Sequence, residues 1–455
     1  MQQLKEDSHD MVHGPILRHL VIFTIPLVLG NVFQLIYNTT DSIIVGRLVG
    51  ENALAAVGTC APIMNLAILL ISGMCMGASI LMSSLYGLGD IEKLKRQIST
   101  TMIGGCIFSI AFSVLMVGLA YPIMWLIHVP SEVVKIALQY LRIIYMGLIF
   151  TFIYNFLANT MRALGDSKTP LFFLIISAVL NVFGDIFFVG VLGWEVEGSA
   201  ISTVISEALC CILCMVYINK RVPLLCLGRD WFVFDKELIK KTISYGSTSA
   251  MQQVALQLGK IVIQTIVNKQ GVGVMAAFTA VNRVDDFAFL PQQNISHAMT
   301  TFLAQNQGAG QKERMRKGFA CGVMIELVYS IGLCLTMYIL AKDIMMLFVD
   351  SGNQTVISMG EGYIKRISYF YILPGLTNGM QGYFRGTGDL KITLLSTAVN
   401  MISRIIALVF MLHFISSEFE NFALANILGW CVMLLVELPL LIKSVKNLRI
   451  GVDKV

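Results

Sequence analysis

The sequence predicts an all-α, polytopic membrane protein whose twelve transmembrane helices form two pseudo-symmetric six-helix bundles. The first observation behind this prediction is the composition, which is 56% hydrophobic and only 13% charged over 455 residues. The second is a series of long apolar runs, and the third is a repeat that relates the two halves of the chain. Soluble proteins are about 25% charged, so this chain lacks the polar surface that water requires.

Apolar runs recur from Leu17 to Ile442, with short polar stretches between them. A helix needs about 20 apolar residues to cross a bilayer, and each run is near or above that length. Transmembrane strands would alternate apolar and polar residues, and the sequence lacks that alternation. We therefore predict spanning helices at about 15–46, 52–85, 97–126, 132–161, 168–192, 196–218, 238–268, 272–305, 315–349, 355–383, 391–414 and 420–443.

Lysine and arginine are concentrated in every second connection between these spans. Basic clusters such as KLKR (93–96) and KERMRK (312–317) follow even-numbered spans, whereas WEVE (194–197) and SSEFE (416–420) carry only acidic charge. Because Lys and Arg stay on the cytoplasmic side, we expect a multi-pass protein of the cell membrane with both termini in the cytoplasm. The chain starts with the polar and acidic MQQLKEDSHD, so no cleavable signal peptide is expected.

The repeat predicts the domain organisation. YNFLANTMRALGDSK (154–168) aligns with TNGMQGYFRGTGDLK (377–391) at a shift of 223 residues, and LYGLGD (85–90) aligns with NQGAGQ (306–311) at a shift of 221. Six spans per half is an even number, so both halves enter the membrane in the same orientation, as parallel repeats do. We predict an N-terminal lobe, a basic cytoplasmic linker and a C-terminal lobe, with a cleft between the lobes that suits alternating access, at 1–218, 219–241 and 242–455.

Two acidic residues lie inside apolar runs of the first half: Asp41 in LIYNTTDSII and Asp185 in VLNVFGDIFF. An ionised carboxylate at membrane depth costs roughly 2.5 to 3.5 kcal/mol or more, so each acid needs polar partners. Gln34, Asn38 and Asp41 share one face of their helix, and Asn181 precedes Asp185 by one turn. We expect these polar stripes to face the interior of the N-terminal bundle rather than lipid.

The two acids together predict an ion-coupling site. A carboxyl group in a low-dielectric, hydrogen-bonded pocket can take up a proton near neutral pH and release it when the pocket opens to water. With the oxygens of Asn181 and Thr203, the same acids could instead hold Na⁺. A structural pair is the alternative, but two intramembrane acids flanked by asparagine favour a function. Arg404 lies near the position that corresponds to Asp185, so we expect the second half to bury bases where the first buries acids.

Four stretches of this sequence resemble the multidrug and toxic compound extrusion (MATE) transporters of the MOP superfamily: IPLVLGNVFQLIYNTTDSIIVGRLVGENALAAVG (25–58), RALGDSKTPLFFLIISAVLNVFGD (162–185), GSAISTVISE (198–207) and FLAQNQGAGQKERMRKG (302–318). The resemblance covers essentially the whole chain and is closest to the DinF-like branch. It implies a V-shaped pair of six-helix lobes that export organic cations against a H⁺ or Na⁺ gradient.

The resemblance also implies a proton-coupled acidic site in the N-terminal lobe, formed by Asp41, Asn181, Asp185 and Thr203. Another branch of the family places an acid on the tenth helix in a D-x-x-Q pattern, but residues 378–381 of this chain are Asn-Gly-Met-Gln. This departure favours protons as the coupling ion, with Na⁺ at Asp41 and Asp185 left as the alternative.

A cavity for lipophilic cations is expected to be lined by aromatic, methionine and polar side chains. The candidates in this sequence are Gln34, Tyr37, Asn38, Phe152, Asn155, Asn159, Asn378, Gln381 and Arg404. For any single aromatic residue, packing between helices is the commoner reason for its presence. Arg283 is expected to form a local ion pair with Asp285 or Asp286. The sequence leaves a functional role open for Glu207, Lys260, Asp285, Asp286 and Glu326.

We therefore expect a secondary active multidrug efflux transporter that acts as a monomer in the lipid bilayer. Its expected partners are organic cations and H⁺ or Na⁺, with no cofactor and no nucleic acid. The alternative is a flippase for lipid-linked oligosaccharides of the same superfamily, which the acidic N-terminal lobe disfavours. An integral membrane enzyme is less favoured still, because the six histidines are scattered and no HExxH or Walker A motif is present.

Overall fold

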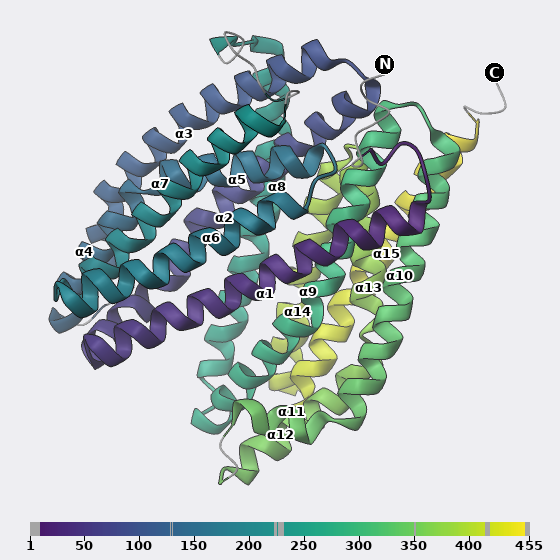
Figure 1. The fold of residues 1–455 in the computed structure, drawn as a ribbon. Coiled ribbons are helices and arrows are strands. Elements are labelled where there is room, and N and C mark those ends of the chain that lie inside the picture. Colours follow the sequence, from purple (N-terminus) through teal and green to yellow (C-terminus); the bar gives the residue numbers. More distant parts are fainter. Residues whose placement is uncertain are drawn as a thin grey trace. The chain divides into compact units, whose positions relative to one another are not determined.

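A computed structural model describes residues 10–450, apart from residues 128, 130, 223–224, 226–231, 350–351 and 415–418. Every regular element in this described part of the chain is a helix (Figure 1). The chain divides into two compact units. The N-terminal unit is formed mainly by Ile25–Ala250, and the C-terminal unit by Met11–Thr24 together with Met251–Val455. Parts of the predicted linker 219–241 and of the acidic loop 416–420 lie outside the described residues.

The N-terminal unit contains most of α1 (Ile16–Leu48), α2 (Glu51–Leu88), α3 (Ile91–Leu126), α4 (Ser131–Met146), α5 (Leu148–Ala163), α6 (Lys168–Asp185), the π-helix η2 (Ile186–Val191), α7 (Glu195–Arg221) and the first part of α8 (Lys236–Asn268). The first residues of α1 belong to the C-terminal unit. The C-terminal unit contains the rest of α8, α9 (Val272–Gly308), α10 (Lys312–Ile339), α11 (Ala341–Phe348), α12 (Gln354–Ser368), α13 (Ile372–Gly386), α14 (Leu390–Phe414) and α15 (Glu420–Ile450).

Each of the twelve predicted spans corresponds to one of these helices or to two consecutive ones, which confirms the predicted all-α fold class. In the described part of the chain, eight helices are individually long and apolar enough to cross a membrane, and the bent pair α4–α5 provides a ninth. The remaining spans, α8, α9 and α12–α13, carry more polar residues. In α9, many of these polar residues are buried inside the unit, as Gln292, Asn294 and Ser296 show.

Two of the predicted spans contain breaks with a clear local cause. α4 and α5 meet at an angle of 45° around Gly147, where a Cβ atom would lie 2.5 Å from the side chain of Val204 on α7. α12 and α13 are separated by a short turn, and Pro374 lies in the first turn of α13. Proline is tolerated in a first turn, where its missing N–H would have no partner. Apolar run length alone does not reveal either break.

The backbone supports the internal repeat. Glycines with φ between +70° and +115° occur at equivalent positions of the two halves, at shifts of 221 to 223 residues: Gly50 and Gly271, Gly89 and Gly310, and Gly165 and Gly388. A left-handed backbone of this kind favours glycine. The most extensive helix contacts also repeat, because α2–α5 and α6–α7 in the N-terminal unit correspond to α9–α13 and α14–α15 in the C-terminal unit.

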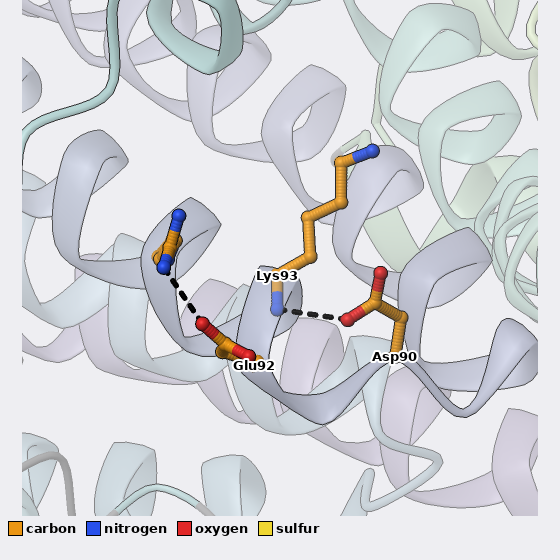
Figure 2. Close-up of polar contacts among 4 residues, drawn as sticks. Asp90, Glu92 and Lys93 are labelled. Atoms are coloured by element: carbon orange, nitrogen blue, oxygen red, sulfur yellow. Dashed lines mark hydrogen bonds and ion pairs between the residues drawn. The ribbon is translucent and has the colours of Figure 1, made fainter.

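The first of the predicted basic connections lies between α2 and α3 and is locally well capped. Gly89 ends α2 in the left-handed conformation, and Asp90 caps α3 by accepting a hydrogen bond from the Lys93 N–H at 3.0 Å (Figure 2). Glu92 forms an exposed ion pair with Arg96 at 2.7 Å, one turn into α3. Side-chain capping of this kind typically contributes about 1 kcal/mol to a helix.

The segment that precedes α1 is held by Arg314 on α10, within the C-terminal unit. The guanidinium donates to the carbonyl oxygens of Met11 at 3.0 Å, His13 at 3.1 Å and Gly14 at 2.8 Å. Asn306 donates to the Met11 oxygen as well, at 3.3 Å, and the Met11 side chain is buried. These contacts fix the start of α1 to the corner between α9 and α10.

Candidate functional site

The structure brings the four predicted coupling residues together inside the N-terminal unit. Asp41 projects from α1, Asn181 and Asp185 lie one turn apart on α6, and Thr203 lies on α7. Asp185 and Asn181 are buried, and Asp41 is partly buried. The first helix of the unit and two neighbouring later helices therefore converge on one polar site.

The carboxyl groups of Asp41 and Asp185 lie next to each other, within electrostatic range. An ionised carboxylate has no proton to donate and can only accept. A hydrogen bond between two carboxyl groups therefore requires one of them to be protonated. Two adjacent carboxylates repel each other, so the arrangement of Asp41 and Asp185 favours binding of one proton by the pair.

Hydroxyl and amide groups donate to one carboxyl oxygen of each acid. The Ser199 hydroxyl donates to Asp41 Oδ1 at 2.8 Å. In the amide orientation that satisfies both ends of Asn181, its Nδ2 donates to Asp185 Oδ2 at 3.1 Å and its oxygen accepts from the Thr203 hydroxyl at 3.0 Å. The Ser202 hydroxyl donates to the backbone oxygen of Asn181 at 2.9 Å and ties α6 to α7.

Two tyrosines complete the surroundings of the acid pair. Tyr37 on α1 lies near the Thr203 side chain and within electrostatic range of both acids. Tyr140 on α4 is buried, and its hydroxyl also lies within range of Asp41 and Asp185. None of the ion pairs found among the described residues includes either acid. Among the described residues, the hydrogen-bond partners of the acid pair are therefore neutral groups.

Sequence reasoning missed three members of this site: Tyr140, Ser199 and Ser202. The two serines belong to the stretch GSAISTVISE, in which polar residues recur every three or four positions and so share one face of a helix. That spacing is a signal that could have identified them. Tyr140 gave no such signal, because a single tyrosine in a transmembrane helix is common.

The other predicted cavity residues of the N-terminal unit do not join the acid pair, apart from Tyr37. Gln34 and Asn38 are exposed on α1. Asn155 and Asn159 donate at 2.8 Å to backbone oxygens one turn earlier in their own helix. Phe152 belongs to the hydrophobic core, where it stacks on Phe156 and packs against Gly105.

The predicted candidates of the C-terminal unit belong to separate hydrogen-bond networks. Gln381 on α13 accepts from Gln252 at 3.1 Å and donates to Thr397 at 3.2 Å. Asn378 donates to the backbone oxygen of Pro374 at 2.9 Å, in its own helix. Neither side chain faces an acid pair of the kind found in the N-terminal unit.

Arg404 lies within electrostatic range of Asp285 and Tyr363. Asp285 also accepts a hydrogen bond from the Tyr371 hydroxyl at 2.7 Å. The expected local pairing of Arg283 is wrong, because Asp286 pairs with Lys260 at 3.1 Å. Lys260 is on α8, so packing between α8 and α9 selects the partner rather than proximity along one helix.

The expectation that the second half buries bases in place of acids is also wrong in that form. The C-terminal unit does bury basic groups, since Arg385 is only 5% exposed. It also buries acids, because Asp285, Glu326 and Glu437 are all buried. What distinguishes most of these acids from Asp41 and Asp185 is the basic residue beside them.

Comparison with known proteins identifies the family. A multi-pass helical fold with an internal repeat and a buried, base-free acid pair is typical of a membrane transporter rather than of an enzyme. Residues 26–187 and 249–410 each match the MatE family, and the chain belongs to that family. The two matched segments are 223 residues apart, which is the shift of the internal repeat.

Individual relatives agree with this assignment. The probable multidrug resistance protein YpnP of Bacillus subtilis (strain 168) is 28% identical over 398 residues, which cover 87% of each chain. The FAD transporter of Shewanella oneidensis is 23% identical over 354 residues, 75% of this chain and 76% of the relative. The crystal structure of MATE in the bent conformation has a TM-score of 0.89 at 19% identity and covers 99% of both chains.

Proposed function

We propose that this chain is a proton-coupled antiporter that exports lipophilic organic cations, and that Asp41 and Asp185 form its coupling site. The observation that carries this proposal is the adjacent position of two carboxyl groups with only neutral hydrogen-bond partners among the described residues. Two carboxylates that share one site repel each other and favour binding of a proton. The name of the relative YpnP, a probable multidrug resistance protein, supports the substrate class.

Loss of the shared proton would leave two adjacent negative charges. Two like charges about 4 Å apart repel by roughly 4 kcal/mol near a protein surface. The site can relieve this repulsion by rebinding a proton or by attracting a cationic substrate. Because only one of these ligands is needed at a time, proton binding and cation binding oppose each other, which is the thermodynamic requirement for exchange.

A proton fits the observed geometry better than Na⁺ does. Na⁺ is a hard cation that would need several oxygen ligands around it, by analogy with Ca²⁺ and Mg²⁺. It would therefore have to separate the two carboxyl groups that now lie next to each other. The oxygens of Ser199 and Thr203 lie close enough to the acids to serve as further ligands, so the two ions must be compared directly.

Transport into inside-out membrane vesicles tests the proposal, with ethidium as the fluorescent cation. A proton gradient that is acidic inside should drive ethidium uptake, and an equal Na⁺ gradient at constant pH should not. Asp41→Asn should abolish the uptake, because the remaining acid has no carboxyl partner with which to share a proton.

Asp343→Asn is the matched control, since it changes an exposed carboxylate at the start of α11 in the same way. Proton-driven uptake that survives Asp41→Asn would refute the coupling role. If a Na⁺ gradient alone drives uptake, the ion that binds at these residues is Na⁺ and not a proton. Absence of cation transport combined with movement of a lipid-linked sugar would favour the flippase.

The topology forms part of the proposal. We propose that the chain acts as a monomer in the cell membrane, with both termini in the cytoplasm and lobes at 1–218 and 242–455. The basic connection 219–241 would then join the lobes on the cytoplasmic side. The distribution of Lys and Arg supports this orientation, and labelling of cysteines introduced into the loops from either side of the membrane tests it.

A further inference from the structure

A third acid of the N-terminal unit extends the polar stripe on α7. Glu207 lies one turn after Thr203 and two turns after Ser199, so the three side chains share one face of the helix. Ser199 contacts Asp41, and Thr203 contacts Asn181. Glu207 therefore continues the face that holds the acid pair.

Glu207 has one hydrogen-bond donor and no basic partner. The Thr151 hydroxyl on α5 donates to Glu207 Oε2 at 2.6 Å, and Thr151 itself is only 7% exposed. None of the ion pairs found in the described part of the chain includes Glu207. Glu207 itself is partly buried, and an ionised carboxylate without a cation is disfavoured in such an environment, whereas the neutral acid is tolerated. The Thr151 hydroxyl can donate to the carbonyl oxygen of that neutral acid as well.

The ionisable groups that face Glu207 come from three helices of the described chain and are all neutral at physiological pH. Tyr37 approaches from α1 and Tyr154 from α5, and Cys210 and Cys211 lie on α7 itself. No lysine or arginine is among them. The environment of Glu207 thus resembles that of the acid pair and differs from that of the paired acids in the C-terminal unit.

Tyr37 connects the two acidic positions. Its hydroxyl lies near the Thr203 side chain and within electrostatic range of Asp41, Asp185 and Glu207. A hydroxyl group can accept one proton while it donates another. The hydroxyls of Tyr37 and Thr203 therefore provide protonatable groups between Glu207 and the acid pair.

We propose that Glu207 is a second proton-binding carboxyl of the N-terminal unit and exchanges its proton with the Asp41–Asp185 pair through Tyr37 and Thr203. In this exchange the Glu207 carboxyl becomes a carboxylate, and the ionised oxygen of the pair becomes a hydroxyl, so charge is conserved. The inference that Glu207 binds a proton rests on the contacts of Glu207 itself. The exchange with the pair rests on the proposed function.

Infrared titration of the full-length protein in lipid nanodiscs tests proton binding directly. Isotope labelling of glutamate separates its carboxyl bands from those of aspartate. We expect a band of a protonated, partly buried glutamate that titrates with pH and that Glu207→Gln removes. Thr151→Val keeps the carboxyl but removes its donor, so it should shift the same band to higher frequency. This second variant keeps the test decisive if Glu207→Gln fails to fold.

Glu326→Gln is the matched control, because Glu326 is a buried glutamate of the C-terminal unit. It should remove a different band and leave the Thr151-sensitive one unchanged. The proposal is overturned if Glu207→Gln removes no titrating band, or if Thr151→Val shifts none. It is also overturned if the pH midpoint of the Glu207 band is the same in Asp41→Asn as in the unmodified protein.

Transport separates this inference from the proposed function. The steady-state ethidium gradient should depend less steeply on the pH gradient in Glu207→Gln, by one proton per cation, with transport retained. An unchanged slope would remove Glu207 from coupling while Asp41→Asn still abolishes uptake. Uptake that persists in Asp41→Asn would instead refute the coupling site, and the infrared bands would still report whether Glu207 binds a proton.

Discussion

The two units share one fold but compensate their buried acids differently. In the N-terminal unit, Asp41 and Asp185 lie next to each other and accept hydrogen bonds from neutral side chains. In the C-terminal unit, the fully buried Glu437 lies within electrostatic range of Arg385. Asp285 has Arg404 within the same range. The repeat therefore preserves helix packing, whereas the electrostatics of the two interiors have diverged.

This difference distinguishes acids whose charge is held by a basic partner from acids that can gain and lose a proton. Removing one partner of a buried ion pair leaves the other charge uncompensated, so each residue of the pair holds the other in one protonation state. An acid that is compensated by hydroxyls, amides and a shared proton can change its state without losing a charged partner. A transporter that must bind and release protons needs the second kind, and this chain has it in the N-terminal unit.

The largest expected effect concerns the acid pair of the N-terminal unit. Asp185→Asn should abolish proton-driven ethidium uptake, because the amide cannot take part in a shared carboxyl proton. The free energy of unfolding should change by no more than about 1 kcal/mol, since a neutral group of the same shape replaces it and can still bond to Asn181. Vesicle transport and denaturant titration in detergent measure the two quantities. A variant that still transports, or one that unfolds, contradicts this assignment.

The opposite result is expected for Arg385 in the C-terminal unit. Arg385 donates to Ser296 at 2.7 Å and lies within electrostatic range of the buried Glu437. Arg385→Met should lower the free energy of unfolding by about 1 to 3 kcal/mol, because Ser296 and the backbone oxygen of Gln381 lose a charged donor and the buried Glu437 loses a cation within electrostatic range. The double variant with Glu437→Gln should recover part of this loss. If the double variant is no more stable than Arg385→Met, the two side chains are not coupled.

A similar or smaller loss is expected when one hydrogen bond to a compensated acid is removed. Tyr371 donates to Asp285 at 2.7 Å, and both side chains are buried. Tyr371→Phe keeps the ring and should lower the free energy of unfolding by about 1 to 3 kcal/mol, because one oxygen of Asp285 loses its donor. Thermal unfolding followed by tryptophan fluorescence measures the change. Tyr338→Phe is the control, since Tyr338 is exposed on α10.

Much of the fold could be predicted from the sequence because it depends on the length of the apolar runs and on the positions of glycine residues in turns. Apolar runs of about 20 residues have few alternatives to a spanning helix. Gly165 and Gly388 recur at the repeat shift because both turns need a left-handed backbone. The break at Gly147 could not be predicted, since it depends on how closely α7 approaches that position.

The candidate site was predictable only where a residue was exceptional for its surroundings. Asp41 and Asp185 are exceptional, because acids inside apolar runs are costly and rare. Phe152 is unexceptional, and the structure places it in the hydrophobic core rather than beside the acids. The link between Glu207 and Thr151 depends on packing between α5 and α7, which the spacing along one helix does not encode.

The smallest expected effect concerns Glu326, which differs from Glu437 and Asp285 because no basic residue of the described chain lies within electrostatic range of it. It is fully buried, and neither carboxyl oxygen has a hydrogen-bond partner among the described residues. A charge in such a place would be strongly disfavoured, so Glu326 must be neutral. Replacing a neutral acid by a neutral amide of the same shape should change little. Glu326→Gln should therefore alter the free energy of unfolding by about 0.5 kcal/mol or less.

The pH dependence of Glu326→Gln provides a second test of the difference between the two units. If Glu326 is neutral across the working range, its replacement should leave both the unfolding midpoint and the slope of ethidium accumulation against the pH gradient unchanged. A stability loss comparable to that of Arg385→Met would reveal a charged partner at Glu326. A changed coupling slope would mean that the C-terminal unit also exchanges protons, and proton exchange would then no longer be confined to the N-terminal repeat.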